Sequence, residues 1–186
     1  MSCRRGVSLA EALLVAALVL MVFGLIAGVL VPALKGWHRA DQRSQVQQNA
    51  MLVVARLRES TRMASPPSVF CGPEVVTLAT CVRPDGSVDS DPSTGAPLWQ
   101  KYLVLYRDPA SQQVRLQENP IDPPASDATP LTSYTPRSDD RVVARHIRLF
   151  TVTKSPDGLI EVVVEAEKGG VRSRFETALT PLVEAE

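Results

Sequence analysis

A run of 23 residues without a charge, Ala12–Leu34, dominates the hydrophobic pattern of this chain. At about 1.5 Å of rise per residue, a helix of that length reaches roughly 34 Å, enough to cross a hydrocarbon core of about 30 Å. The run is longer than the apolar stretch of a secretory signal peptide, which has about 7 to 15 residues. We therefore predict a membrane-spanning helix.

Apolar residues continue at helical spacing beyond this run. Four of them recur at intervals of four, three and four positions: Val46, Ala50, Val53 and Leu57. This spacing places them on one helical face. No proline occurs in 35–64, and Ser65-Pro66-Pro67 then ends the pattern, because the residue before a proline is driven out of the α region. The sequence predicts one long helix whose second half packs on a domain.

After Pro67 the pattern changes to short β-branched or alternating segments separated by turn residues. We predict strands over 74–82, 99–106, 113–117, 145–154, 159–167 and 171–179. In the segment 145–154, alternation places Ile147, Leu149 and Thr151 on one face and Phe150 and Val152 on the other. The fold class that follows is α+β, with a long N-terminal helix packed on an antiparallel sheet domain.

The segment 118–140 contains five prolines and few apolar residues. A structureless loop of this length within a compact domain is uncommon and is usually functional or mobile. We expect it to be mobile; a loop that binds a partner or forms a subunit interface is the alternative.

An acidic residue, Glu11, stands at the start of the apolar run. A carboxylate at the centre of a membrane helix costs about 2.5–3.5 kcal/mol, and less near an end. Arg5 and Arg4 precede Glu11 by six and seven positions, whereas helical side chains meet at spacings of three or four. A carboxylate in this place therefore needs either a positively charged partner from outside this segment or a function that offsets its cost.

The stretch Arg4-Arg5-Gly6-Val7-Ser8-Leu9-Ala10-Glu11 resembles the type IV prepilin signal: a basic leader ending in glycine, an apolar residue, a hydroxyl residue, leucine, and glutamate five positions after the glycine. Val7 and Ser8 replace the most frequent phenylalanine and threonine of the family. The resemblance implies that a membrane peptidase cleaves between Gly6 and Val7 and methylates the new amine. It also implies that Glu11 pairs with the N-terminal amine of a neighbouring subunit. The alternative is a signal anchor whose glutamate reaches water at the interface.

Pro32 lies within the predicted span, near three glycines that lower helix propensity: Gly24, Gly28 and Gly36. We predict a kink at Pro32. Either this is an ordinary proline-kinked span, or it corresponds to the melted or kinked part of the helix in pilin filaments.

The predicted organisation is a leader over 1–6, a transmembrane helix over 7–34, its amphipathic continuation over 35–65 and an exported β-rich domain over 66–186. Arg4 and Arg5 ahead of the span favour a cytoplasmic N-terminus. We therefore expect a single-pass protein of the cytoplasmic (inner) membrane, with its C-terminal domain in the periplasm or on a surface filament.

Three cysteines are present, of which Cys3 lies in the predicted leader. Cys71 and Cys81 are ten positions apart in a domain expected to face an oxidising compartment, where disulfides form. We predict a disulfide between them; two separate buried thiols are the alternative.

Charge and candidate chemistry favour a structural protein. The 20 basic residues match the 20 acidic ones, and removal of the leader leaves 18 basic against 20 acidic residues, so the chain has no general attraction for nucleic acid. Five arginines could form a basic stripe, but interleaved acids such as Glu161, Glu165 and Glu167 favour a solvated sheet face: Arg141, Arg145, Arg148, Arg172 and Arg174. Alternating oxygen ligands over 85–91 are compatible with calcium, but the loop lacks the EF-hand order, and we expect a solvated turn.

No motif for catalysis is visible. His38 and His146 do not stand in a motif with a nucleophile, and the chain has no glycine-rich phosphate loop and no zinc spacing. We expect no enzymatic activity, no cofactor and no metal.

The C-terminal pattern, with its last strand over Phe175–Pro181, is similar to that of J-type pseudopilins and W-type minor pilins. Together the resemblances imply a minor pilin or pseudopilin that helps to initiate or tip a type IV pilus or a type II secretion pseudopilus. The implied partners are other major and minor pilins or pseudopilins, the prepilin peptidase and the inner-membrane assembly platform. A bitopic, membrane-anchored extracytoplasmic binding protein without a filament role is the second hypothesis.

Overall fold

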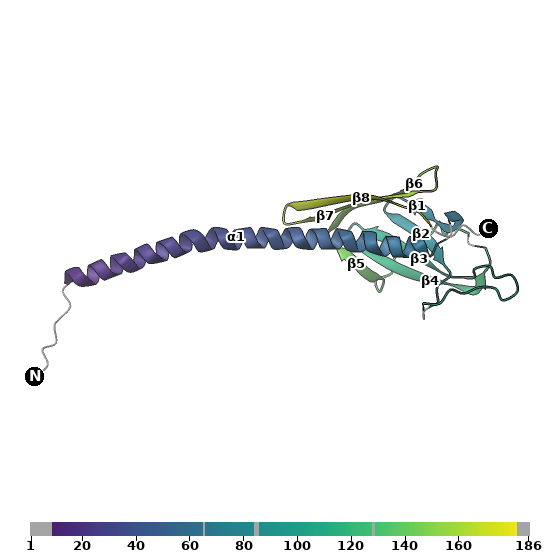
Figure 1. Ribbon diagram of the computed structural model, residues 1–186, viewed down its shortest axis with the longest axis horizontal. Coiled ribbons are helices and arrows are strands. Elements are labelled where there is room, and N and C mark those ends of the chain that lie inside the picture. Colours follow the sequence, from purple (N-terminus) through teal and green to yellow (C-terminus); the bar gives the residue numbers. More distant parts are fainter. Residues whose placement is uncertain (1–8, 65, 84–85, 128, 182–186) are drawn as a thin grey trace, which may run out of the picture. The chain divides into compact units, whose positions relative to one another are not determined.

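The computed structural model describes residues 9–64, 66–83, 86–127 and 129–181 (Figure 1). The chain divides into two compact units that meet between Asp41 and Gln42. The described residues form one long helix and two antiparallel sheets, which is the predicted α+β architecture.

The first unit is the N-terminal part of α1 (Leu9–Arg62), which continues through Pro32. Large apolar side chains along this part are exposed, for example Leu20 at 72% and Phe23 at 65%. Within the part of the chain that the structure describes, α1 is the one helix long and apolar enough to cross a membrane, and none of its apolar window is buried. It is consistent with a single-pass membrane anchor; the kink at Pro32 stays a prediction.

In the second unit α1 buries the predicted stripe. Val46, Ala50, Val53 and Leu57 are all fully buried, which confirms the helical face read from their spacing. The helix ends at Arg62, and a short 3₁₀ turn (Pro66–Ser68) follows. Ser65, part of the predicted stop signal, lies outside the described residues.

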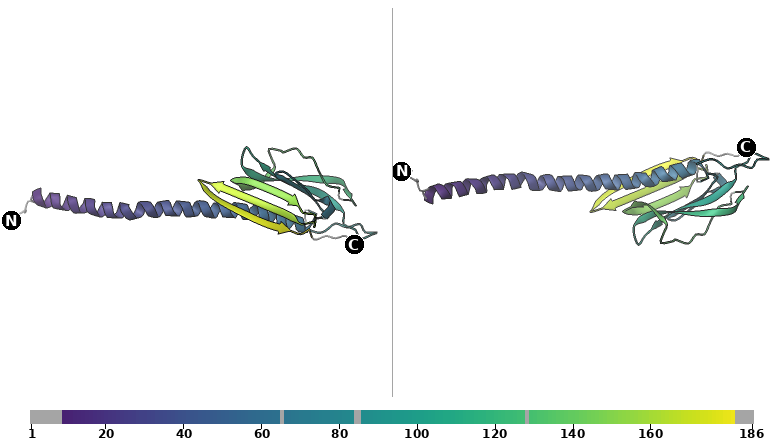
Figure 2. Two further views of the ribbon diagram at one scale, coloured as in Figure 1. Left: turned by 90° about the horizontal axis from the view of Figure 1, so that it is seen from above. Right: turned by 90° about the horizontal axis from the view of Figure 1, so that it is seen from below.

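Two antiparallel sheets complete the second unit (Figure 2). The first has the order β1 (Phe70–Gly72), β2 (Val75–Thr80), β3 (Trp99–Asp108), β4 (Gln113–Ala125) and β5 (Arg141–Arg145). The second has the order β6 (Ile147–Lys154), β7 (Ile160–Lys168) and β8 (Val171–Leu179). An isolated bridge between Pro73 and Thr151 links the two sheets.

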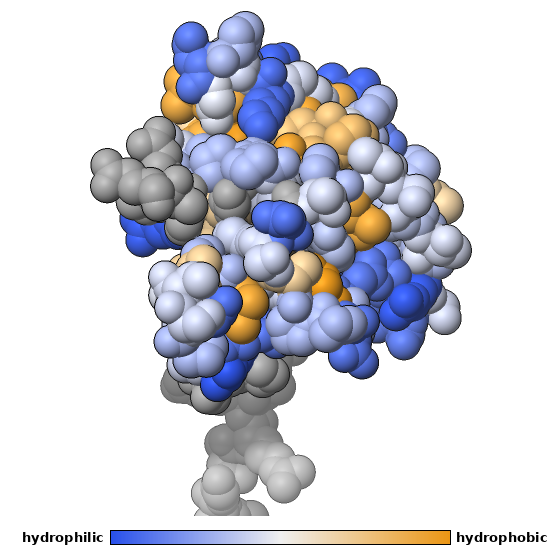
Figure 3. Space-filling model, turned by 90° about the vertical axis from the view of Figure 1, so that its right-hand side faces the viewer, coloured by the Kyte–Doolittle hydropathy of each residue, from blue (hydrophilic) through white to orange (hydrophobic). Residues whose placement is uncertain are grey.

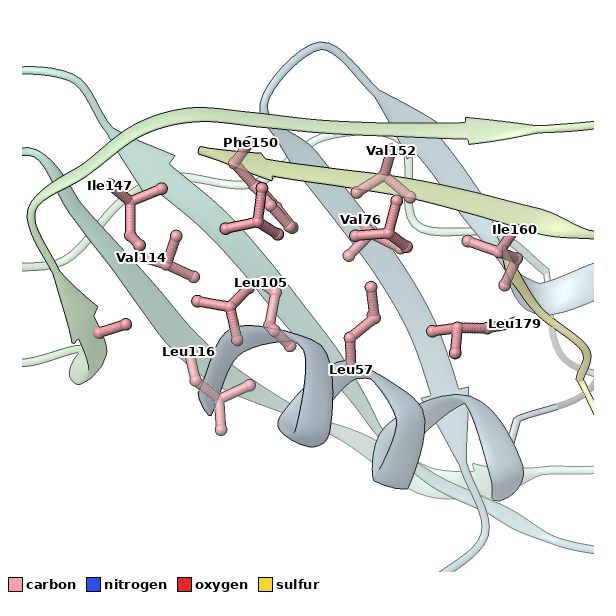
Figure 4. Packing of buried hydrophobic residues seen from close by; sticks show 14 of the residues in the cluster. Leu57, Val76, Leu105, Val114, Leu116, Ile147, Phe150, Val152, Ile160 and Leu179 are labelled. Carbon is pink, nitrogen blue, oxygen red and sulfur yellow. The ribbon is translucent and has the colours of Figure 1, made fainter. Parts of the chain in front are cut away.

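One hydrophobic core joins the helix to both sheets (Figure 4). Leu57 of α1 packs in it with side chains of the first sheet, such as Leu105, and of the second sheet, such as Phe150. On the surface shown in Figure 3, by contrast, hydrophilic side chains surround small, separate hydrophobic areas.

The alternation predicted for the segment 145–154 is wrong at Ile147. The structure buries Ile147 in the core together with Phe150 and Val152. The pairing of β6 with β7 shifts between Ile147 and Leu149, so one extra residue, Arg148, interrupts the alternation and moves Ile147 to the other face.

The predicted loop 118–140 is partly strand. β4 continues to Ala125 and pairs with β3 along most of this length. β5 pairs with β4 only over Gln113–Leu116, so the rest of β4 is an edge, where prolines cost no ladder hydrogen bond on the open side.

The remainder of the 118–140 segment lies against the first sheet. Tyr102 Oη donates to the carbonyl of Thr129 (2.9 Å), and Thr77 Oγ1 donates to that of Leu131 (2.6 Å). Leu131 and Tyr134 are half-buried against this sheet, so the segment has more to bury than its composition indicated.

Candidate functional site

Glu11 lies in the first turn of α1, two residues after the helix begins at Leu9. The neighbouring apolar side chains Leu13 and Leu14 are 64% and 62% exposed. The positive end of the helix dipole favours a carboxylate in this turn. The predicted cleavage residues Gly6 and Val7 and the leader residues Arg4 and Arg5 lie outside the described residues.

The exposed apolar surface of the first unit is consistent with a membrane anchor. Apolar side chains face outward from Leu9 to Trp37, which is itself 77% exposed. A helix that is apolar all round belongs in lipid or among other apolar helices. The carboxylate of Glu11 therefore stands at one end of a surface suited to lipid or to neighbouring helices.

The predicted disulfide is wrong, because Cys71 and Cys81 are both free thiols. Cys71 lies opposite Val76 in the β1–β2 pair, and Cys81 follows five positions after Val76. At about 3.3 Å per extended residue this separates them by roughly 16 Å, whereas a disulfide needs Cα atoms within about 7 Å.

The two thiols also contact different clusters. Cys71 packs against the main core, whereas Cys81 packs with Ala79 and Trp99. Burial raises the pKa of both thiols. The strand predicted over 74–82 was the signal that could have excluded the disulfide, because an extended strand separates its ends.

We expect a reductant to leave the thermal midpoint of the purified protein unchanged, since no disulfide constrains its unfolded state. Because the raised pKa keeps each thiol protonated at neutral pH and the thiolate is the nucleophile, iodoacetamide should label Cys71 and Cys81 more slowly in the folded protein than in guanidinium chloride. Mass spectrometry of the labelled peptides measures both rates. A midpoint that falls by several degrees with dithiothreitol would contradict the free thiols.

Two carboxylates of the acidic segment 85–91, those of Asp89 and Asp91, accept hydrogen bonds from other residues of the chain. Asp89 is 8% exposed and accepts hydrogen bonds from the side chains of Arg83 and Gln100. Asp91 accepts from the backbone N–H (2.8 Å) and the hydroxyl (2.6 Å) of Ser93, which lowers the pKa of Asp91. Asp85 lies outside the described residues. The buried Asp89 differs from the solvated turn predicted here.

The arginines considered as a basic stripe are divided between two sheets. Arg141 and Arg145 lie on β5 of the first sheet, and the other three lie on β6 and β8 of the second. Arg148 contacts Glu165 (3.4 Å) and Glu167 (3.1 Å). Two further ion pairs on β8 and β7 have N···O distances of 2.9 and 2.5 Å: Arg172–Glu167 and Arg174–Glu176. The interleaved acids therefore neutralise the second sheet's arginines, as their spacing indicated.

A polar cluster that the sequence did not indicate lies near the C-terminal end of β3. Tyr106, 2% exposed, donates from its hydroxyl to Asp140 (2.7 Å) and stacks at a tilt on Tyr134, with ring centroids 5.1 Å apart. Burial and the neighbouring carboxylate of Asp140 raise the pKa of Tyr106. The cluster holds the 129–140 segment against the first sheet. This structural role accounts for the cluster without a ligand.

Comparisons with known proteins assign no family to this chain. No family model, no curated protein and no solved structure matches it. The function must therefore be argued from its own residues, above all from the exposed apolar helix and the carboxylate at its start.

Proposed function

We propose that this protein is a minor pilin or pseudopilin, a structural subunit that helps to initiate or tip a type IV pilus or a type II secretion pseudopilus. One observation carries the proposal: the order Gly6-Val7-Ser8-Leu9-Ala10-Glu11 leads directly into an exposed apolar helix. The continuation of that same helix is packed into a β-rich domain.

In this mechanism α1 first anchors the subunit in the cytoplasmic membrane and then packs among the helices of neighbouring subunits. Cleavage after Gly6 exposes an amine at Val7, and Glu11 of an incoming subunit pairs with the amine of a neighbour. In hydrocarbon each charge alone carries a large desolvation penalty, and the pair relieves both. Glu11 therefore sets the position of one subunit against the next.

The other partners follow from this role. The prepilin peptidase processes the leader, the inner-membrane assembly platform inserts the subunit, and major and minor pilins or pseudopilins surround it. The β-rich domain is extracytoplasmic, in the periplasm or on a surface filament. The protein acts without catalysis, without a cofactor and without specific binding of nucleic acid.

Intact-mass and N-terminal analysis of the protein from its native membrane tests the proposal. We expect a chain that begins at N-methylated Val7. As a control, the Gly6→Leu variant should retain its first six residues, since the resemblance implies that the peptidase requires the glycine. A native chain that keeps these six residues would overturn the proposed function.

The second candidate is a bitopic, membrane-anchored extracytoplasmic binding protein. The exposed apolar helix fits a plain anchor as well as it fits a filament subunit. An anchor has no need of processing, so an intact Met1 in the native protein would favour this function.

A further inference from the structure

The apolar run of the first unit is followed on α1 by two exposed cations. Lys35 comes directly after Leu34, and Arg39 follows about one turn later. Residues four positions apart lie on the same helical face, with Cβ atoms about 5–6 Å apart. Both side chains are exposed, so two positive charges stand side by side on the helix where its apolar surface ends.

Neither cation is matched by an acid. Among the residues that the structure describes, neither Lys35 nor Arg39 takes part in an ion pair. Asp41 is the one acidic residue between positions 12 and 58 of the sequence, a stretch with five lysines and arginines. This part of the helix therefore carries an excess of positive charge.

The positions of Lys35 and Arg39 correspond to the headgroup layer of a bilayer that the apolar run spans. At about 1.5 Å of rise per residue, they lie roughly 1.5 and 7.5 Å beyond Leu34. The headgroup layer extends about 5–8 Å beyond the hydrocarbon core on each side. Long basic side chains also place their charged ends in this layer. Both charges therefore lie at the level of the lipid phosphate groups.

Trp37 indicates the same level independently of the charges. It lies between the two cations in the sequence and is 77% exposed. Tryptophan is enriched at membrane–water interfaces, where its amphipathic ring lies among the headgroups. The segment from Lys35 to Arg39 thus combines an exposed interfacial aromatic residue with two unmatched cations.

We propose that Lys35 and Arg39 bind the phosphate groups of anionic phospholipids and so enrich these lipids around α1. A guanidinium binds a phosphate through two parallel hydrogen bonds, and an ammonium binds it as a point charge. One basic residue near an anionic membrane surface strengthens the association about fivefold. The inference rests on membrane anchorage, which the filament subunit and the plain anchor share, so it goes beyond the proposed function.

Quenching of Trp37 fluorescence by brominated lipids tests this inference. The full-length chain is reconstituted into liposomes of phosphatidylcholine and phosphatidylglycerol, in which one lipid or the other carries bromine on its acyl chains near the headgroup. Trp99, the second tryptophan, is 3% exposed and contributes a constant background. We expect phosphatidylglycerol to bind beside Trp37 about fivefold more strongly than phosphatidylcholine. The preference should disappear in about 1 M salt, where charges are screened beyond about 3 Å.

Two double variants with the same loss of charge separate a local site from an effect of net charge. Lys35→Gln/Arg39→Gln should abolish the preference for phosphatidylglycerol. Arg58→Gln/Arg62→Gln removes a second exposed pair four positions apart on α1, well beyond the apolar run, and should leave the preference unchanged. Brominated phosphatidylcholine should still quench Trp37 in both variants, because the apolar run inserts the helix.

Two results would overturn the inference alone. Equal binding of the two lipids to the unaltered chain would leave the cations for an acidic partner polypeptide, and an equal loss of preference in both double variants would show an effect of net charge. If neither brominated lipid quenched Trp37, the membrane anchor itself would be wrong, and this inference with it.

Discussion

If the protein is the filament subunit proposed above, replacing Glu11 with alanine should leave its insertion into the membrane intact and remove it from the filament. The substitution eliminates the charge in the apolar helix, so insertion becomes easier. It also removes one partner of the proposed ion pair between the Glu11 carboxylate and the N-terminal amine of a neighbouring subunit. Removing one partner of a buried ion pair costs about 3–5 kcal/mol. Since about 1.4 kcal/mol is a factor of ten, the fraction assembled should fall about a hundredfold or more.

Two measurements in the same cells check this result. Carbonate extraction of membranes gives the inserted fraction, and immunoblotting of sheared filaments or of the crosslinked tip complex gives the assembled fraction. Glu11→Lys should be at least as defective, because it places a like charge against the neighbour's amine. Asp41→Ala changes an exposed acid of α1 outside the apolar run and should assemble normally. Normal assembly of Glu11→Ala would remove the proposed mechanism.

The parts of the fold that depend on local periodicity could be predicted from the sequence. The helical stripe from Val46 to Leu57 is buried at every predicted position. The strands β7 and β8 lie within one residue of their predicted ends. Their connection uses Gly169 and Gly170, with φ of 58° and 80°, which is the Gly-Gly signature of a tight hairpin turn.

The parts that depend on neighbours in space could not be predicted. Prolines over 118–125 indicate a loop by composition, yet this stretch is the second half of β4. What makes it possible is the early end of β5, which leaves that half of β4 at the edge. The bulge at Arg148 has the same origin, since it belongs to the pairing with β7 and not to β6 alone.

The candidate site divides in the same way. The position of Glu11 at the start of an apolar helix follows from the sequence alone, and the structure places it in the first turn of α1. The cluster of Tyr106, Tyr134 and Asp140 has no sequence signature, because these side chains meet only after the 129–140 segment packs on β3. A resemblance confined to the N-terminal segment could not indicate it.

Replacing Leu57 with alanine should cost about 2–5 kcal/mol of unfolding free energy, the range for buried leucines. Leu57 is fully buried, with 0% of its surface accessible, and it packs with core residues of both sheets. The cavity would therefore open where the helix and the two sheets meet. Leu52→Ala is the matched control, because Leu52 is 53% exposed on the same helix and should change stability by about 0.5 kcal/mol or less.

Denaturant unfolding of the full chain in detergent measures both changes. In a Trp37→Phe background, the fluorescence of Trp99, which is 3% exposed in the β-rich unit, reports the unfolding of that unit. A domain of this kind has about 5–15 kcal/mol of stability in total, so the Leu57→Ala variant should unfold at a much lower denaturant concentration than Leu52→Ala. If the two variants unfolded together, the C-terminal part of α1 could not be part of the core of the β-rich unit.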